Sequence, residues 1–454
     1  MAQFPDQFIW GTSTSAYQIE GAWNEDGRGP SIWDTFSHRR GKVRGGDSGD
    51  TAIDHYHHWK EDIQLMASLG LKAYRFSVSW PRILPQGKGA INQAGLDFYS
   101  RLVDLLLEKG IVPYPTLYHY DLPLSLQSGG GWTNRSTAQY FADYAAVVGR
   151  SLGDRVDHFF TINEPTVIAM LGHLTGEHAP GQRNPFAALA VIHHLLLGHG
   201  MAVQSLRSSA PRPLSIGIAI NLGPVYPASS SPQDARAARL VDALANRIVL
   251  DPLLKGLYPP EISQGWLWRW LEKGISYPGG RGVRPEDLQT ISVPLEFLGI
   301  NYYTRTVVKS APLIQALPVR PSQSAYSQMW EIYPEGIYDL LLRVHNDYHH
   351  PNLIIAENGI PVPDTLTPAE EIHDQERISY LEAHVRQISR ALDAGVPVSG
   401  YFVWSLLDNF EWALGYSCRF GLVHVDFGTQ KRTLKDSATW YAKIIRQNGI
   451  LPAR

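Results

Sequence analysis

The sequence has very little of what builds disulfides or charged binding surfaces. Its 454 residues include one cysteine, Cys418, so no disulfide can form within the chain and an oxidising compartment is not indicated. Charged residues make up 18% of the chain and the formal net charge is −3, which provides no field for collecting nucleic acid or anionic lipid. We therefore expect neutral small molecules as partners, and no nucleic acid.

Segments for export or membrane insertion are also missing. Residues 1–6 contain neither the basic region nor the apolar stretch of a signal peptide, and no run approaches about 18 consecutive apolar residues. We expect a soluble, cytoplasmic protein with no membrane partner. The isoelectric point of about 6.6 suits a monomer and leaves a homo-oligomer open.

Metal-binding spacings are absent as well. The chain has 17 histidines, but pairs such as His57 with His58 and His193 with His194 are adjacent in sequence. Neighbouring residues on a helix point about 100° apart, so such a pair does not easily bind one ion. Because no His-Glu-x-x-His spacing occurs either, the sequence predicts no metal site.

Aromatic residues, in contrast, are abundant. They make up 11% of the chain, with 13 Trp and 22 Tyr. A Trp side chain combines an apolar face with a polar edge, and this combination suits the C–H faces and hydroxyls of sugar rings. A large aromatic core would explain the same composition, so composition alone leaves both interpretations open.

Short apolar runs alternate with segments of helical period along the whole chain. The runs cover residues 8–11, 73–77, 112–117, 158–162, 215–220, 297–303, 353–356 and 399–404. The helical segments cover residues 54–69, 94–109, 138–151, 185–209, 235–250, 335–346, 377–394 and 434–447. Eight strands in strict alternation with eight helices predict an α/β fold, a (β/α)8 TIM barrel, as a single domain over residues 1–454.

A doubly wound sheet has similar alternation and is the main competing fold. No phosphate-cradling glycine motif follows an early strand, which counts against the nucleotide-binding forms of that fold. Four Gly/Pro-rich insertions cover residues 21–50, 258–285, 310–326 and 359–368. Since strand-to-helix loops emerge at the catalytic face of a barrel, we expect most of them to form the walls of a substrate cleft.

Two glutamates each end an apolar, strand-like run. Glu164 stands before Pro165, Glu357 stands before Asn358 and Gly359, and the two glutamates are 193 residues apart. A barrel delivers such strand-end residues to its carboxyl rim, where active sites of this fold are found. Glycoside hydrolysis is the chemistry that above all needs two facing carboxyl groups.

Seven ordered motifs resemble those of glycoside hydrolase family 1, the β-glucosidase family, over nearly the whole chain. They are residues 8–21 (FIWGTSTSAYQIEG), 74–82 (YRFSVSWPR), 119–123 (HYDLP), 161–165 (TINEP), 299–303 (GINYY), 357–359 (ENG) and 404–412 (WSLLDNFEW). The resemblance implies one (β/α)8 barrel and retaining hydrolysis of β-linked glycosides without a cofactor.

The resemblance assigns Glu357 as nucleophile and Glu164 as acid/base. It also places Arg75 and the hydroxyl of Tyr303 beside Glu357, where a cation and a donor favour the ionised carboxylate. Glu164 must begin protonated, which partial desolvation and the charge of Glu357 would promote. Asn301 could orient Glu164 or simply shape the end of its strand.

The residues that match the family's sugar-binding positions carry suitable chemistry. Gln18 and Glu411 offer acceptors for neighbouring hydroxyls, His119 and Trp412 offer donors, and Trp404 offers a stacking floor. Asn163 is expected to hold the 2-hydroxyl in the transition state.

Two features bear on the substrate class. Relatives that cleave 6-phosphorylated sugars replace the residue matching Glu411 with a small polar one, whereas this carboxylate would repel a phosphate. Most relatives carry Trp where this chain has Tyr120, and the difference leaves the preference among glucose, galactose and fucose open. On the aglycone side, Trp330 matches a family position, while Asn221, Tyr302, Phe420 and His178 are candidates by position only.

Taken together, the motifs predict a retaining exo-β-glucosidase. It would remove terminal β-D-glucosyl residues from cellobiose-like and aryl β-glucosides, with some acceptance of β-fucosides and β-galactosides. The alternatives are a 6-phospho-β-glycosidase and a catalytically inactive carbohydrate-binding relative; the second typically loses one of the two glutamates, and this chain retains both.

Overall fold

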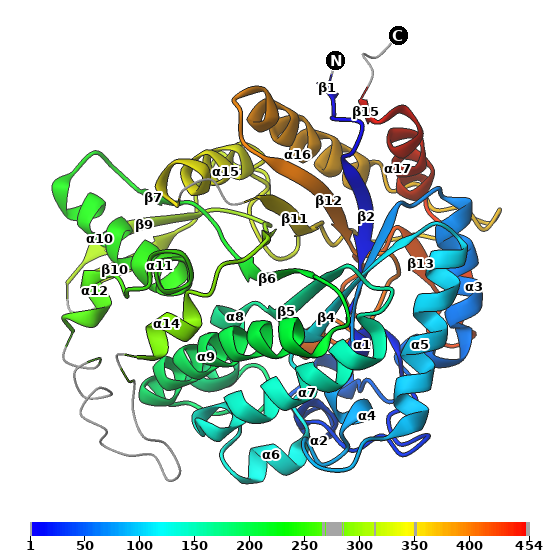
Figure 1. The fold of residues 1–454 in the computed structure, drawn as a ribbon. Coiled ribbons are helices and arrows are strands. Elements are labelled where there is room, and N and C mark those ends of the chain that lie inside the picture. Colours follow the sequence, from blue (N-terminus) through cyan, green and yellow to red (C-terminus); the bar gives the residue numbers. More distant parts are fainter. Residues whose placement is uncertain are drawn as a thin grey trace.

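Eight parallel strands close a barrel in the computed structural model, which describes residues 2–265, 268, 284, 286–312, 315–348 and 352–450 (Figure 1). The order around the barrel is β11-β12-β2-β3-β4-β5-β6-β8. These strands are β2 (Ile9–Ser13), β3 (Ala73–Ser77), β4 (Val112–Tyr118), β5 (His158–Asn163), β6 (Ser215–Asn221), β8 (Phe297–Asn301), β11 (Leu353–Asn358) and β12 (Val398–Trp404). The predicted barrel is confirmed, and each predicted run forms one of its strands.

Eight helices form the outer layer in the predicted alternation with the strands (Figure 1). They are α3 (His55–Ser68), α5 (Gln93–Glu108), α7 (Ser136–Leu152), α9 (Pro185–Ser209), α10 (Pro232–Asp242), α15 (Glu335–Asp347), α16 (Gln375–Asp393) and α17 (Asp436–Gln447). Shorter helices and turns within the loops are α1 (Ala16–Ile19), α2 (Ile32–Ser37), η1 (Arg44–Gly46), α4 (Trp80–Ile83), α6 (Leu124–Ser128), η2 (Gly131–Thr133), α8 (Pro165–Ala169), η3 (Met170–Thr175), α12 (Pro260–Ser263), α14 (Asp287–Ile291) and η5 (Trp412–Leu414).

The helical segment predicted over residues 235–250 differs most from the expectation. It is divided into α10, a π-turn η4 (Ala243–Arg247) and α11 (Ile248–Lys255), after which Gly256 adopts a left-handed φ of 66°. Within the π-turn, the Asn246 side chain donates to the Gly223 carbonyl at 2.9 Å and to Asp242 Oδ1 at 2.8 Å. The partner at Gly223 lies in the loop after β6, so no local periodicity could have indicated this turn.

One of the four predicted loops is partly a sheet. Residues 310–326 include β10 (Gln315–Val319), which pairs antiparallel with β9 (Thr306–Ala311) and extends a sheet to β7 (Val225–Pro227) outside the barrel (Figure 1). Burial of Val308 against Ala237 and Ala238 of α10 fixes this sheet on the helix. Most of the predicted loop 258–285 lies outside the described residues.

Two apolar layers position the active end of the barrel. An inner cluster fills the barrel with one face of the strands, including Tyr114, Phe160, Phe297 and Phe402. The other strand faces pack against the surrounding helices in a second, larger cluster. Because both faces of a parallel sheet are covered, its strands are apolar almost throughout, and polar side chains gather at their ends.

Helix α9 is long and apolar enough to cross a membrane, judged by length and composition alone. In the fold, 89% of its most apolar window is buried, much of it against α7 and the neighbouring elements. Its apolar character is that of a helix in a protein core. At the opposite end of the fold, β1 (Ala2–Gln3) pairs with β15 (Gly449–Ile450), which brings the two ends of the described chain side by side (Figure 1).

Candidate active site

A cavity of about 190 Å³ opens at the carboxyl ends of the barrel strands. Ten of the residues predicted for catalysis or sugar binding line it: His119, Tyr120, Glu164, Tyr303, Trp330, Glu357, Trp404, Glu411, Trp412 and Phe420. Arg75, Asn163, Asn301 and Gln18 are fully buried and reach the lining residues through hydrogen bonds. A larger hollow of about 420 Å³ lies outside the barrel between α10 and β9, and no carboxylate is among its described lining residues.

Both predicted catalytic glutamates stand at strand ends. Asn163 is the last residue of β5, and Glu164 follows with a left-handed φ of 47° before Pro165 begins α8. A non-glycine residue in this region costs of order 1 kcal/mol and is found most often at functional sites. Glu357 is the second-last residue of β11 and pairs with Asn301 of β8.

The strand end at Glu357 is held tightly against β12. An added Cβ on Gly359 would lie 1.8 Å from the Trp404 carbonyl oxygen, so this position accepts only glycine without movement of the backbone. Gly359 therefore lets the chain after Glu357 pack directly against the backbone of Trp404.

The Glu357 carboxylate contacts the two groups that were predicted for it. Arg75 Nη1 donates to Oε1 at 2.6 Å, and the Tyr303 hydroxyl donates to Oε2 at 2.7 Å. Burial nevertheless raises the pKa of Glu357 to about 7; Arg75 opposes this rise and the charge of Glu164 adds to it. Arg75 and the Tyr303 hydroxyl favour the ionised carboxylate, as expected, but burial in a cavity shared with a second carboxyl group outweighs them.

Glu164 contacts neutral donors only, as far as the described residues show. Its Oε1 accepts from Asn301 Nδ2 at 2.9 Å and from Asn221 Nδ2 at 3.2 Å. Its Oε2 accepts from the Tyr120 hydroxyl. Of the two roles left open for Asn301, its bond to Glu164 supports the orienting one.

One hydrogen-bond chain joins the two glutamates beneath the cavity. Asn163 Oδ1 accepts from Arg75 Nη2 at 2.7 Å and from Asn301 Nδ2 at 3.0 Å. Arg75 in turn holds Glu357, and Asn301 holds Glu164. The relative position of the two carboxyl groups is therefore set by side chains from four different strands.

His119 is held as a neutral donor. The orientation of Asn163 is fixed by Arg75, so its Nδ2 must donate to His119 Nε2, at 3.0 Å. Burial, followed by the charge of Arg75, lowers the pKa of His119 well below its ordinary value. The ring proton then resides on Nδ1, which has no protein partner among the described residues and can bond a hydroxyl.

The carboxylate of Glu411 is steadied from behind by Gln18. Gln18 Nε2 donates to Asn409 Oδ1, to the Phe410 carbonyl and, at 3.4 Å, to Glu411 Oε2, while its Oε1 accepts from Ser15. The predicted acceptor of Gln18 is therefore already engaged within the protein. Burial and then the charges of Glu357 and Glu164 raise the pKa of Glu411 to about 8.

Aromatic rings form the walls. The rings of Trp404 and Trp412 lie nearly parallel to that of His119, with centroids 5.9 and 6.0 Å away. Trp330 packs between Tyr303 and Phe420, at 4.9 and 5.9 Å, in one apolar cluster with Trp404. These rings supply the stacking surfaces that the Trp content suggested.

Of the four candidates chosen by position alone, three line the cavity and one does not. Phe420 and His178 line the cavity, and Asn221 both lines it and bonds Glu164. Tyr302 instead donates to the Tyr333 carbonyl at 2.6 Å and is buried in the core. Asn221 is the last residue of β6, so its strand-end position was the signal that could have identified it.

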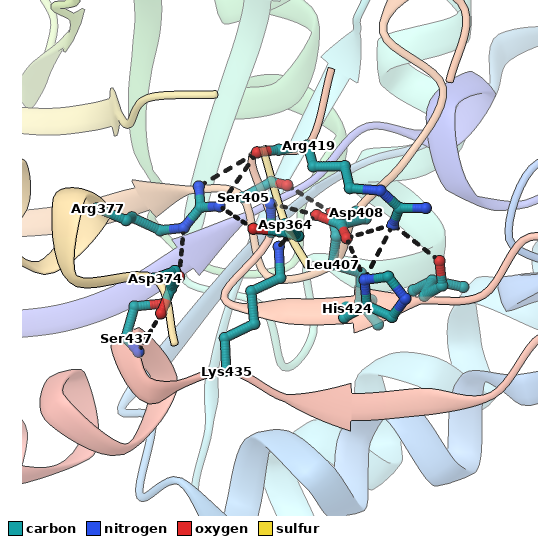
Figure 2. Close-up of polar contacts among 12 residues, drawn as sticks. Asp364, Asp374, Arg377, Ser405, Leu407, Asp408, Arg419, His424, Lys435 and Ser437 are labelled. Atoms are coloured by element: carbon teal, nitrogen blue, oxygen red, sulfur yellow. Dashed lines mark hydrogen bonds and ion pairs between the residues drawn. The ribbon is translucent and has the colours of Figure 1, made fainter. Parts of the chain in front are cut away.

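A cluster of Asp364, Asp408 and His424 resembles a metal site, since its ligand atoms lie within 4.8 Å of one another. Figure 2 shows that Lys435 points between the two carboxylates, bonding Asp364 and, at 2.8 Å, Asp408. Arg419 Nη1 lies 2.7 Å from Asp408 Oδ2 on the other side. Because protein cations already neutralise these acceptors, the cluster fits an ion-pair network rather than a metal site.

The comparisons agree with the motifs. A family model described as glycosyl hydrolase family 1 matches residues 1–450. "Beta-glucosidase A" of Acetivibrio thermocellus is 48% identical over 98% of this chain and 99% of its own, and a "bifunctional beta-D-glucosidase/beta-D-fucosidase" of Bifidobacterium breve is 43% identical over 97% and 98%. The structure of a Thermotoga maritima β-glucosidase with glucoimidazole superposes with a TM-score of 0.94, at 46% identity over 99% and 100% of the two chains.

Proposed function

This chain belongs to glycosyl hydrolase family 1, and from that premise we propose that it is a retaining exo-β-glucosidase. Its substrates would be cellobiose-like and aryl β-glucosides, cleaved at the terminal non-reducing residue. The observation that carries the proposal is the continuous chain Glu357–Arg75–Asn163–Asn301–Glu164, which holds two carboxyl groups over one cavity.

The two carboxyl groups take different roles because their neighbours differ. Arg75 donates to Glu357, whereas only neutral donors contact Glu164, so the negative charge is better accommodated on Glu357 and the transferable proton on Glu164. Glu357 then serves as nucleophile and Glu164 as acid.

In the first step, a Glu357 oxygen forms a bond to the anomeric carbon. The bond from that carbon to the leaving oxygen breaks, its electron pair goes to that oxygen, and the proton of Glu164 follows. As the ester forms, Glu357 loses the negative charge that the hydrogen bonds from Arg75 and Tyr303 had stabilised.

In the second step, Glu164 is ionised and takes a proton from water. The water oxygen bonds the anomeric carbon, the ester bond breaks, and its electron pair returns to Glu357. Two inversions leave the β configuration unchanged, and the enzyme regains its starting protonation state.

The walls of the cavity suit a glucosyl unit. Trp404 offers an apolar ring face, His119 Nδ1 a donor, and Glu411 acceptor atoms steadied by Gln18. Asn163 is linked through Arg75 and Asn301 to both carboxyl groups, and we propose that the 2-hydroxyl of a bound sugar lies beside it. We propose that β-fucosides are accepted as well, supported by the name of the Bifidobacterium relative. Acceptance of β-galactosides is proposed from the family resemblance of the sequence alone.

The alternatives fit the site less well. A 6-phosphate would meet the Glu411 carboxylate in a cavity that already holds two further carboxyl groups. A binding protein without activity would not need both glutamates in one hydrogen-bond chain. The absence of a cofactor, the cytoplasmic location and the oligomeric state remain predictions.

The test measures initial rates on 4-nitrophenyl β-glucoside, β-galactoside, β-fucoside and 6-phospho-β-glucoside. We expect activity on the glucoside and fucoside, none with Glu357→Gly, and a severe loss with Glu164→Ala that azide partly restores by forming a β-glycosyl azide. Glu108→Ala, at an exposed position on α5, is the matched control. Activity confined to the phosphorylated substrate, or retained by Glu357→Gly, would refute the assignment.

A further inference from the structure

Tyr120 lies at a position that fixes its hydroxyl over the acid/base glutamate. It is the second residue after β4, has a left-handed φ of 76°, and is 6% exposed. Its ring packs against Trp412 at 4.8 Å and against His119 at 4.9 Å. A side chain confined in this way has little freedom to turn its hydroxyl elsewhere.

The contacts of Glu164 distinguish its two oxygens. Oε1 faces two amide groups, Asn301 Nδ2 at 2.9 Å and Asn221 Nδ2 at 3.2 Å. Oε2 faces the Tyr120 hydroxyl, which also receives a bond from Asn163 Nδ2 at 3.4 Å. An amide nitrogen can only donate, whereas a phenolic oxygen can donate and accept.

This difference decides where a protonated Glu164 carries its hydrogen. A proton on Oε1 would point at two N–H donors and find no acceptor. A proton on Oε2 can be accepted by the phenolic oxygen of Tyr120. After the proton has left, the same hydroxyl rotates its hydrogen toward Oε2 and stabilises the carboxylate.

We propose that Tyr120 is a positioning residue for the acid/base: its hydroxyl directs the exchangeable proton of Glu164 to Oε2 and supports the ionised form that activates water. The inference rests on the proposed function. During glycosylation the proton passes from Oε2 to the leaving oxygen, which must approach beside the Tyr120 hydroxyl. During deglycosylation a water proton returns to Oε2, and Tyr120 changes from donor to acceptor.

Tyr120 itself does not supply the proton. Burial, and then the negative charge of Glu164, raises its pKa well above the ordinary value, so the phenol stays neutral. The other titratable or charged groups around the site come from β3, β11 and the loops after β4, β8, β12 and η3, and are Arg75, Glu357, His119, Tyr303, Glu411 and His178. Among the described residues, Tyr120 is the side chain that bonds Oε2.

The test compares kcat/KM against pH for wild type and Tyr120→Phe on 4-nitrophenyl β-glucoside. Loss of the donor disfavours the ionised acid/base, so we expect the basic limb of the profile to move up by about one to two pH units, the usual worth of a hydrogen bond to a charged group. The matched control is Tyr144→Phe, whose buried hydroxyl donates to the Val78 carbonyl at 2.9 Å away from the cavity. That control should leave the limb in place.

A second variant keeps the inference testable if Tyr120→Phe does not fold. Incorporation of 3-fluorotyrosine at position 120 keeps the shape and strengthens the donor, so the basic limb should move to lower pH. A limb that is unchanged, or displaced in the same direction by both variants, overturns the inference. Wild type without activity on any β-glycoside would instead contradict the proposed function, which keeps the two failures distinguishable.

Discussion

At the scale of single residues, Arg75 is the cation that distinguishes the surroundings of the two glutamates. It is fully buried, bonds Glu357 and Asn163, and lies 4.8 Å above the Phe160 ring of the inner apolar cluster. A guanidinium in this position has lost its water and is compensated by the protein alone. Its charge therefore acts at close range on the pair of glutamates.

Replacement of Arg75 by Met should raise the pKa of Glu357 above its present value of about 7, because the cation that opposes the effect of burial is gone. The acidic limb of kcat/KM should move to higher pH, with kcat at pH 6 reduced by a factor of about 100 or more, as for loss of a buried partner worth 3–5 kcal/mol. The measurement is a pH series on the glucoside. Arg75→Lys keeps a charge and should shift the limb less; a limb at lower pH in Arg75→Met would contradict this role.

At the scale of elements, the loop between β12 and β13 (Val423–Val425) carries much of the site. This loop, residues 405–422, contains Glu411, Trp412 and Phe420. Asp408 holds it closed by accepting from Gly421 N at 2.9 Å, and Lys435, just before α17, bonds Asp408 from below. Figure 2 shows how Arg377 of α16 joins the network through Asp364 and the Arg419 carbonyl.

Lys435→Met should leave Asp364 and Asp408 without their shared cation. We expect a loss of about 3–5 kcal/mol in the free energy of unfolding at pH 7 and a raised KM, because the loop that carries Glu411 loosens. Burial alone would raise the pKa of Asp408, but Lys435, His424 and Arg419 together hold it below its ordinary value. The network therefore stabilises the fold above about pH 4, and this stabilisation is lost as the pH falls further.

Denaturant unfolding at pH 7 and near pH 3 measures this difference. The gap between wild type and variant should shrink at the lower pH. Lys443→Met, at an exposed position on α17, serves as the control and should match wild type at both values. A gap that is equal or larger at pH 3 would show that Asp408 is not stabilised as its contacts indicate.

At the scale of the whole molecule, closure of the barrel joins the first and last parts of the chain. β2 pairs with β12, β1 pairs with β15, and the larger apolar cluster runs from Ala2 to Ile450. A closed barrel has no free strand edge, so the loss of one strand exposes its neighbours on both sides. The small apolar cluster at the site, formed by Trp404, Cys418 and Phe420, is built on β12 and the loop after it rather than on a separate domain.

The whole chain should therefore unfold in one transition by scanning calorimetry. A sugar mimic such as deoxynojirimycin at about 100 times its dissociation constant should stabilise the folded state by about 2.7 kcal/mol and move the whole transition to higher temperature. Glu357→Gly, which lacks the nucleophile carboxylate, is the control and should show a smaller shift. Two transitions, with only one displaced by the mimic, would contradict a single domain.

Much of this fold was predictable because its signals are local. Eight apolar runs and eight helical segments follow from residue periodicity, and both glutamates were identified by their places at strand ends. The helix break at Ala243–Arg247 and the pairing of β10 were not predictable, because Asn246 bonds the loop after β6 and Val308 packs on α10.

The sequence by itself determined the barrel and the strand-end places of the two glutamates that line its cavity, since both depend on patterns within a few residues. Only the tertiary structure decided the surroundings of these groups. It raises the pKa of Glu357, brings Asn221 and Tyr120 into hydrogen bonds with Glu164, and buries Tyr302 in the core, away from the cavity. The physical reason is distance along the chain. Burial and hydrogen-bond partners are supplied by residues tens to hundreds of positions away, as Arg75 and Glu357 show, and no local pattern records them.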